Sequence, residues 1–326
     1  MHRRTFIILS LLVVAVVALA ACAKPKDPQQ SRLKAGKAAL EKGDTATAIR
    51  ELEALINADP KQAEARALLG RAYEKANRPD DAIIQYQAAV TLQSQDAEMS
   101  YHLGALLVGA GKPADAIAPL AAGLKLNPGL ASGFTQEISA AVKAGLTAGN
   151  NLVGAGQSQQ AIEQYKAVLS LDPKNMSATT NMGAALYQLG KLDEAIAQFQ
   201  EALKLAPEDA ETHYLLGAAY IQQNKVKEAQ SEFQAALKSN SNLAPAYIGL
   251  GNAQMLQNDL EGAAVSLAKA AQLAPNSPEA LYALGRVLMQ KGDQAGARQA
   301  FQQFLALNPP PNRRAEVEGW LKQLGQ

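Results

Sequence analysis

Only a few side chains in this sequence are suited to covalent or metal chemistry. Cys22 is the single cysteine among 326 residues, so neither an internal disulfide nor a zinc site of paired cysteines can form. The three histidines, His2, His102 and His213, are far apart in the sequence, and no His-Glu-x-x-His motif occurs. We therefore interpret His102 and His213 as polar helix residues and predict no bound metal.

The segment Gly109-Ala110-Gly111-Lys112 is the nearest approach to a phosphate-binding loop. It fails the motif, because Pro113 stands where Ser or Thr would bind Mg²⁺ and the first glycine of the motif is missing. The many carboxylates are interpreted as solvated helix faces. The sequence therefore predicts a protein that is not an enzyme, with no cofactor and no small-molecule substrate.

The composition favours helices and gives no electrostatic reason to expect nucleic acid as a partner. There are 31 basic and 30 acidic side chains, for a formal net charge of +1, and aromatic residues make up 5%. Nucleic-acid binding needs an excess of basic residues that neutralise phosphates. Alanine, leucine, glutamine, glutamate and lysine dominate, and all of them favour the α-helix.

The first 21 residues have the organisation of a secretory signal peptide. His2, Arg3 and Arg4 precede a nearly unbroken apolar run from Phe6 to Ala21. A basic start, a short apolar stretch and small residues before a cleavage point define such signals. The apolar run is shorter than the ~20 residues that span a bilayer comfortably.

The segment Leu19-Ala20-Ala21-Cys22 resembles the lipobox of bacterial lipoproteins. The resemblance implies cleavage before Cys22, a diacylglycerol on its sulfur and an acyl chain, such as palmitate, on its new amine. Two or more acyl chains give stable membrane anchoring. Since Ala23 rather than Asp follows, the resemblance implies a periplasm-facing outer-membrane lipoprotein. The alternative is an uncleaved membrane anchor with an incidental cysteine.

Beyond the signal, three classes of residue recur with a period of 34. The first is a glycine, at Gly36, Gly70, Gly104, Gly149, Gly183, Gly217, Gly251 and Gly285. The second, seven residues later, is Gly or Asn, at Gly43, Asn77, Gly111, Gly156, Gly190, Asn224, Asn258 and Gly292. The third class lies twelve residues after the glycine of each repeat and is always alanine. Most repeats also close with a proline, such as Pro173 or Pro207.

Each class has a physical reason. Glycine inside a helix costs about 1 kcal/mol relative to alanine, so the repeated glycines indicate close approach of a partner helix. We expect the alanine to face the glycine from that second helix. The Gly/Asn class predicts the end of the first helix, where a left-handed residue is needed. The large residues at regular spacing, such as Phe199 and Phe233, predict a packed core rather than a cofactor site.

A period of 34 residues with small, large and small positions resembles the tetratricopeptide repeat. The resemblance implies an all-α fold, a right-handed α-solenoid of eight helix hairpins. It divides the chain into a signal (1–21), a lipidated cysteine with a disordered tether (22–31), repeats one to three (29–128), an insertion (129–141), repeats four to eight (142–309) and a capping helix (310–326). Trp320 is expected to pack within that cap.

The insertion interrupts the period, because Gly149 follows Gly104 by 45 residues rather than 34. Phe134, Ile138 and Leu146 stay roughly on one helical face, which favours a lengthened first helix in the fourth repeat. Gly129 and Gly133 favour the alternative, a flexible hinge between two blocks.

In the resembling family the first helices of successive repeats line a concave groove. The family register implies that this groove is lined here by Tyr101, Asn150, Tyr187, Tyr214, Ile221, Ile248, Asn252, Met255, Tyr282 and Arg286. Apolar anchors with a few amides suit a peptide segment of a protein partner. The alternative is that several of these residues pack between repeats. Lys37 and Arg71 match part of the family's clamp for acidic C-termini, but its asparagines are missing.

These features together predict a protein-interaction scaffold anchored in the bacterial envelope. It resembles the repeat-bearing lipoproteins that pilot pilus secretins, which implies help in assembling a pilus, secretin, secretion or outer-membrane assembly complex. The alternative is an accessory subunit that recruits or regulates an enzyme of cell-wall or exopolysaccharide synthesis.

Overall fold

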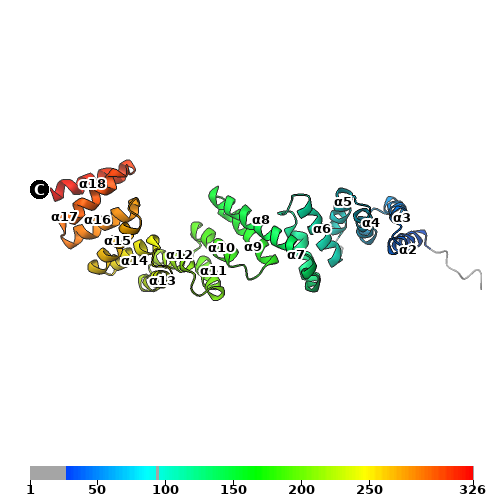
Figure 1. Ribbon diagram of the computed structural model, residues 1–326, viewed down its shortest axis with the longest axis horizontal. Coiled ribbons are helices and arrows are strands. Elements are labelled where there is room, and N and C mark those ends of the chain that lie inside the picture. Colours follow the sequence, from blue (N-terminus) through cyan, green and yellow to red (C-terminus); the bar gives the residue numbers. More distant parts are fainter. Residues whose placement is uncertain (1–26, 93–94, 326) are drawn as a thin grey trace, which may run out of the picture. The chain divides into compact units, whose positions relative to one another are not determined.

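The computed structural model describes residues 27–92 and 95–325, and its regular elements there are helices. Cys22, the predicted signal and the first half of the predicted tether lie outside the described residues. Consecutive helices pack in pairs joined by short turns (Figure 1). The all-α, paired-helix architecture predicted from the period is confirmed.

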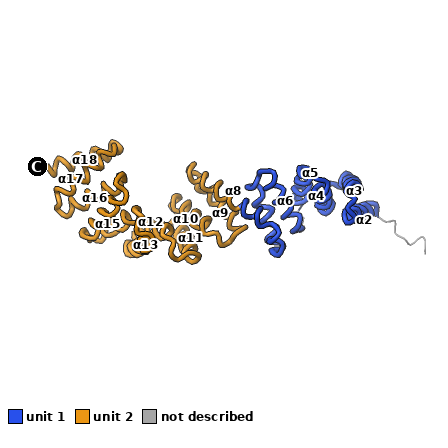
Figure 2. The backbone as a smooth tube through the Cα atoms, viewed as in Figure 1, with its two compact units in different colours: residues 1–141 blue, residues 142–326 orange. Residues whose placement is uncertain are grey.

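The chain divides into two compact units, residues 1–141 and 142–326 (Figure 2). The helix pairs of unit 1 are α2 (Pro28–Glu41) with α3 (Thr45–Ala58), α4 (Ala63–Lys75) with α5 (Pro79–Thr91), and α6 (Ala97–Gly109) with α7 (Ile117–Leu126). A 3₁₀ helix, η1 (Pro128–Gly133), follows. Helix α8 (Thr135–Gly154) begins in unit 1 and continues into unit 2.

Unit 2 contains the remaining pairs and a final single helix. They are α9 (Ser158–Leu171) after α8, α10 (Met176–Gln188) with α11 (Leu192–Leu205), α12 (Ala210–Gln222) with α13 (Val226–Ser239), α14 (Ala244–Leu256) with α15 (Leu260–Leu273), α16 (Pro278–Lys291) with α17 (Gln294–Ala306), and α18 (Pro311–Leu324).

Short polar side chains start many of these helices. Asp209 is the N-cap of α12, and its carboxylate accepts a hydrogen bond from the Thr212 amide at 2.8 Å. Asn175 does the same for α10, accepting from the Ala178 amide at 2.9 Å. Such caps satisfy amides that have no partner inside the helix and stabilise it by about 1 kcal/mol each.

All eight residues of the Gly/Asn class have the left-handed backbone that the sequence predicted. Their φ angles range from 56° at Asn77 to 83° at Gly292. Each lies where the first helix of its pair ends, so the chain can reverse into the second helix. Side chains other than Gly, Asn and Asp would be strained at these turns.

The repeated glycines face a different partner from the one expected. A Cβ added to Gly183 would lie 2.7 Å from the ring of Phe199, and one added to Gly217 would lie 2.7 Å from the ring of Phe233. In all eight pairs the nearest atoms belong to the large residue sixteen positions on. The alanines twelve positions on, such as Ala195, are fully buried but are not the nearest partners. Glycine is therefore needed to admit a large side chain.

The insertion forms η1 and the start of a long helix. Helix α8 has 20 residues, against 13 in α6, α10 and α12. Phe134, just before α8, stacks on the Tyr101 ring at a centroid distance of 4.9 Å. The inserted segment thus packs on the third repeat within unit 1.

The C-terminal end of the segment predicted as a tether is helical. Pro28, Gln29 and Gln30 lie in the first turn of α2, and the Asp27 carboxylate caps that turn through the Gln29 amide. Proline is compatible with the first helical turn, because its missing N–H has no helical partner there.

Helix α18 covers the last pair of unit 2. Val317 is fully buried, and Trp320 packs on Phe301 at a centroid distance of 5.3 Å. Leu281 and Phe304 belong to the same apolar cluster. The final helix therefore buries the apolar face that α16 and α17 would otherwise expose, as expected for the terminal element of a solenoid.

The tight contact at Gly183 predicts that Gly183→Ala destabilises the protein. Phe199 is fully buried and cannot move away from a new methyl group. We expect a loss of about 1–3 kcal/mol, which outweighs the better helix propensity of alanine. Denaturant unfolding followed by circular dichroism measures the change.

The matched control is Gly319→Ala in α18, where an added Cβ meets nothing within 4 Å. There the propensity alone acts, and stability rises by up to about 1 kcal/mol. Equal effects of the two substitutions would contradict the packing explanation.

Candidate functional site

Eight of the ten predicted groove residues lie around three adjoining pockets of unit 2. They are Tyr187, Tyr214, Ile221, Ile248, Asn252, Met255, Tyr282 and Arg286. These side chains come from α10, α12, α14 and α16, the first helices of four successive pairs. The spacing of 34 residues brings equivalent positions to one surface, which we call the groove.

The first pocket, called the apolar pocket, lies between α12 and α14 and has a volume of about 470 Å³. Tyr214, Ile221 and Ile248 contribute half-buried side chains to it. Phe233 and Gly249 also line it. A Cβ at position 249 would come within 2.5 Å of the Phe233 ring, so glycine lets that ring lie directly beside α14. The pocket suits a bulky apolar side chain.

Tyrosine hydroxyls add polar groups at the edge of the apolar pocket. The Tyr187 hydroxyl accepts a hydrogen bond from the Gln222 side-chain amide at 2.8 Å, which links α10 to α12. Burial raises the pKa of Tyr214, so its phenol stays neutral at physiological pH. These tyrosines therefore add polar groups without adding charge.

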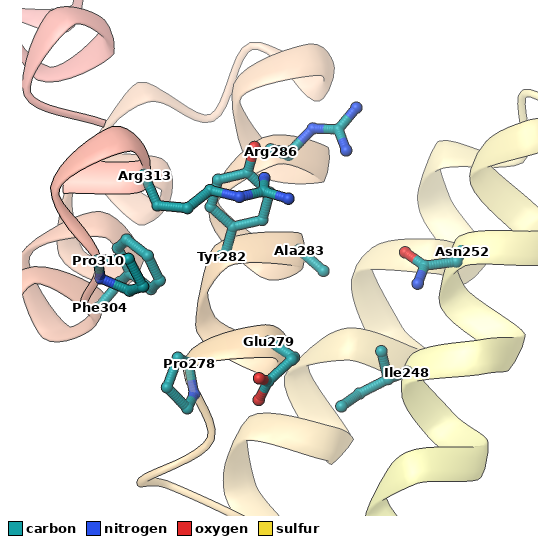
Figure 3. A pocket seen from close by; sticks show the side chains of 10 residues that line it. All are labelled: Ile248, Asn252, Pro278, Glu279, Tyr282, Ala283, Arg286, Phe304, Pro310 and Arg313. Atoms are coloured by element: carbon teal, nitrogen blue, oxygen red, sulfur yellow. The ribbon is translucent and has the colours of Figure 1, made fainter. Parts of the chain in front are cut away.

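The second pocket, called the arginine pocket, lies between α14, α16 and α18 and has a volume of about 510 Å³ (Figure 3). Ile248 and Asn252 project into it from α14, and Tyr282 and Arg286 line it from α16 (Figure 3). Arg313 reaches in from α18, with its guanidinium carbon 4.4 Å from the centroid of the Tyr282 ring. This pocket combines an aromatic surface with two cations.

Tyr282 is the organising residue of the arginine pocket. Its ring packs against Phe304 and Trp320, at centroid distances of 5.5 and 5.7 Å. Its hydroxyl donates a hydrogen bond to Glu316 at 3.0 Å. Burial, followed by this bond to Glu316, raises the pKa of Tyr282. The ring is therefore fixed as a platform for the arginines.

The third pocket, called the rim pocket, is formed by Asn252, Met255, Leu256, Arg286 and Gln290. It shares Asn252 and Arg286 with the arginine pocket. The apolar and arginine pockets in turn share Ile248, Asn252 and Glu279. The three pockets therefore form one continuous lining.

Tyr101 is a correction to the predicted groove. Its side chain is 0% exposed, because Phe134 of the insertion stacks on it and its hydroxyl donates to the Asn127 carbonyl at 3.2 Å. It belongs to the core of unit 1 and offers no surface to a partner. An insertion outside the repeat register supplied the covering ring, so the register could not reveal it.

Asn150 lies apart from the three pockets, in a separate pocket of unit 2 with Leu146 and Asn181. Its side-chain oxygen accepts hydrogen bonds from the Tyr165 hydroxyl at 2.7 Å and from the Asn181 amide at 2.9 Å. The first bond joins the two helices of one repeat and the second joins that repeat to the next, so Asn150 contributes to packing.

The two clamp-like cations in unit 1 are engaged by neighbouring acids. Arg71 binds Asp96 at 3.0 Å and Glu98 at 2.8 Å, and Lys37 lies 3.9 Å from Glu64. These pairs compete with any acidic partner for the two side chains.

Both remaining histidines hold helices together. His102 contacts Glu74 at 2.9 Å, and the second oxygen of Glu74 accepts from the Tyr86 hydroxyl, also at 2.9 Å. His213 contacts Glu232 at 2.6 Å and the Pro207 carbonyl at 3.0 Å. Within residues 27–92 and 95–325, no cluster of three or more potential ligands could hold a metal ion.

None of the helices in the described part of the chain is long and apolar enough to cross a bilayer.

Several lining residues were not found from the sequence. Arg313 and Pro310 come from the C-terminal segment, outside the repeat, so the register gives no information about them. Gly249 carried a usable signal, because it is a glycine in a first helix that belongs to none of the repeated classes.

Comparison with known families agrees with this geometry. A family model described as TPR repeat matches residues 149–190 and 183–224. Two models described as tetratricopeptide repeat match residues 33–97, 78–131 and 214–278, and residues 254–316. The chain belongs to the tetratricopeptide repeat family. No curated protein matches it.

Solved structures of the family are similar to parts of the chain. MamA from Desulfovibrio magneticus RS-1 is 24% identical, with a TM-score of 0.46, over 51% of this chain and 94% of that one. YrrB, described as a TPR protein with an unusual peptide-binding site, is 20% identical, with a TM-score of 0.44, over 54% and 90%. The APC/C hetero-tetramer Cut9–Hcn1 is 16% identical, with a TM-score of 0.50, over 89% and 55%. This last likeness supports the fold alone.

The contact between His102 and Glu74 predicts a pH-dependent stability. Its hydrogen bond to Glu74 raises the pKa of His102 above 6.5, despite burial. Burial would raise the pKa of Glu74, but its bonds to His102 and Tyr86 lower it below 4.5. The contribution of His102 is therefore complete below about pH 6.5 and is lost as pH rises through its raised pKa.

We expect His102→Gln to destabilise the protein by up to about 1 kcal/mol near pH 6 and by much less near pH 9. Thermal unfolding of both proteins at the two pH values measures this. A difference between wild type and variant that stays constant with pH would contradict the assignment.

Proposed function

We propose that this protein is a scaffold that holds a polypeptide segment of a partner protein in the groove of unit 2. The observation that carries the proposal is the continuous lining of three adjoining pockets by side chains from four successive repeats. Membership of the tetratricopeptide repeat family supports binding as the activity. The function proposed is recognition, without catalysis by the chain itself.

The chemistry of the lining favours a polypeptide. Aromatic and aliphatic side chains supply apolar contact area at Tyr214, Ile221 and Ile248. The Asn252 side chain, common to all three pockets, can both donate and accept hydrogen bonds, as a peptide backbone requires. Met255 adds an adaptable apolar contact at the rim.

We further propose that the mature protein is anchored by lipid on Cys22 and faces the periplasm from the outer membrane. The lipobox-like segment Leu19–Cys22 supports this part of the proposal. In that setting the groove would help to assemble an envelope complex such as a pilus, a secretin, a secretion system or an outer-membrane assembly machine. Recruitment of a cell-wall or exopolysaccharide enzyme is the alternative, and the identity of the partner distinguishes them.

The groove proposal predicts that the double variant Tyr187→Ala/Ile221→Ala loses its partner. Both side chains line the apolar pocket, and contact residues of this kind contribute about 2 kcal/mol or more to binding when they are central. We expect recovery of the partner to fall by about tenfold or more. The measurement is photo-crosslinking in detergent-solubilised envelopes, followed by mass spectrometry of the crosslinked peptides.

Tyr247→Ala is the matched control, since Tyr247 is a half-buried tyrosine of α14 that lines none of the three pockets. It should recover the partner as wild type does. Crosslinks that map outside the groove would count against the proposal. So would equal recovery of the partner by the wild type and both variants, provided that the variants keep the helicity of the wild type.

The lipid proposal predicts that Cys22→Ser abolishes labelling by radioactive palmitate and releases the protein from the membrane fraction. Serine has no thiol to receive the diacylglycerol. Labelling and fractionation of cells that express either form provide the measurement. A wild-type protein that is unlabelled and retains residues 1–21 would establish the uncleaved anchor instead.

A further inference from the structure

We infer that the groove of unit 2 selects a partner segment in which an acidic side chain lies close to a bulky apolar one. The inference rests on the proposed function and specifies the chemistry of the partner. It depends on two neighbouring subsites: the apolar pocket for the bulky side chain, and Arg286 for the carboxylate.

The two subsites are adjacent. Ile248, Asn252 and Glu279 line both the apolar pocket and the arginine pocket, so the two pockets adjoin. A single extended or helical segment can therefore place neighbouring side chains in both at once. Because the pockets are adjacent, one partner segment must carry the acidic and the bulky apolar side chains close together in its sequence.

Arg286 is the cation of the groove that is left to bind an acid. Within residues 27–92 and 95–325, no carboxylate lies within 4.0 Å of its guanidinium. Arg313, by contrast, already lies 3.7 Å from Glu316. Glu279 is a carboxylate of the same pocket, and it accepts a hydrogen bond from the neutral Ser277 hydroxyl at 3.0 Å.

Arg286 lies beside an aromatic ring, which does not neutralise its charge. Its guanidinium carbon lies 5.8 Å from the centroid of the Tyr282 ring, which is itself fixed by Phe304, Trp320 and Glu316. Stacking on an aromatic ring leaves the N–H donors of a guanidinium available. Such a planar donor set binds a carboxylate through two parallel hydrogen bonds, which a lysine cannot do.

Asn252 lies between the subsites and completes the site. It is exposed and lines all three pockets. In the described part of the chain its side-chain amide has no hydrogen-bond partner. Its donor and acceptor can bind the peptide group between the apolar and acidic residues. A free small acid would leave both this amide and the apolar pocket unused, so the geometry favours a polypeptide.

The test uses the full chain in detergent and a phage-displayed library of random twelve-residue peptides. We expect the selected peptides to carry Asp or Glu within about four residues of Phe, Tyr, Leu, Ile or Met, the reach of one helical turn. A synthetic peptide of the selected sequence and its Asp→Asn or Glu→Gln counterpart are then compared by fluorescence anisotropy. The acidic peptide should bind about tenfold more tightly, as a hydrogen bond to a charged group implies.

Arg286→Gln should abolish that preference, while the counterpart peptide binds as it does to wild type. Arg298→Gln is the matched control, because Arg298 is an exposed arginine of α17 outside the pockets, and it should keep the full preference. Tyr187→Ala/Ile221→Ala should weaken both peptides equally.

The outcomes separate this inference from the proposed function. Peptides that bind in the groove with no acidic preference, or a preference that survives Arg286→Gln, would overturn the inference and leave the scaffold proposal standing. Failure to select any peptide that Tyr187→Ala/Ile221→Ala weakens would overturn both.

Discussion

The structure depends on one repeated contact, between a glycine in the first helix of each pair and a large side chain in the second. At Gly183 and Phe199, as at Gly217 and Phe233, the ring occupies the space that a Cβ would fill. Burial of this large side chain, a ring or a leucine, contributes to the apolar stabilisation of each pair. The same contact fixes how closely the helices approach, so it determines where the remaining side chains of the first helix point. The groove is a consequence of that geometry.

Most of the fold could be predicted from the sequence, because each class of residue recurs in all eight repeats. The left-handed turns at Asn77 or Gly292 follow from backbone sterics alone, and the structure has them where the pattern placed them. The glycines were found, but their partner was not. Spacing along a chain shows that a small residue is needed without showing which of two nearby residues fills the gap.

In the candidate site, too, residues within the repeat could be predicted, and some residues outside it could not. Tyr214, Ile248 and Asn252 lie together because the repeat brings equivalent positions to one surface. Tyr101 fails because Phe134 comes from an insertion with no register. Arg313 could not be predicted as a site residue, because it lies on α18, after the last repeat. The contact of Arg313 with Tyr282 depends on tertiary packing. Repeated positions could therefore be predicted from their register, whereas the contacts of Phe134 and Arg313 could not.

Helix α18 has a consequence for how such an array can change in length. It closes the apolar end of unit 2, and together with its N-cap residue Pro310 it also provides Arg313 to the arginine pocket. An additional hairpin inserted between α17 and α18 would preserve every repeat contact, yet it would carry both residues away from Tyr282. Growth of the solenoid at that end is therefore constrained by the binding surface, whereas a hairpin added before α2 would leave that surface intact.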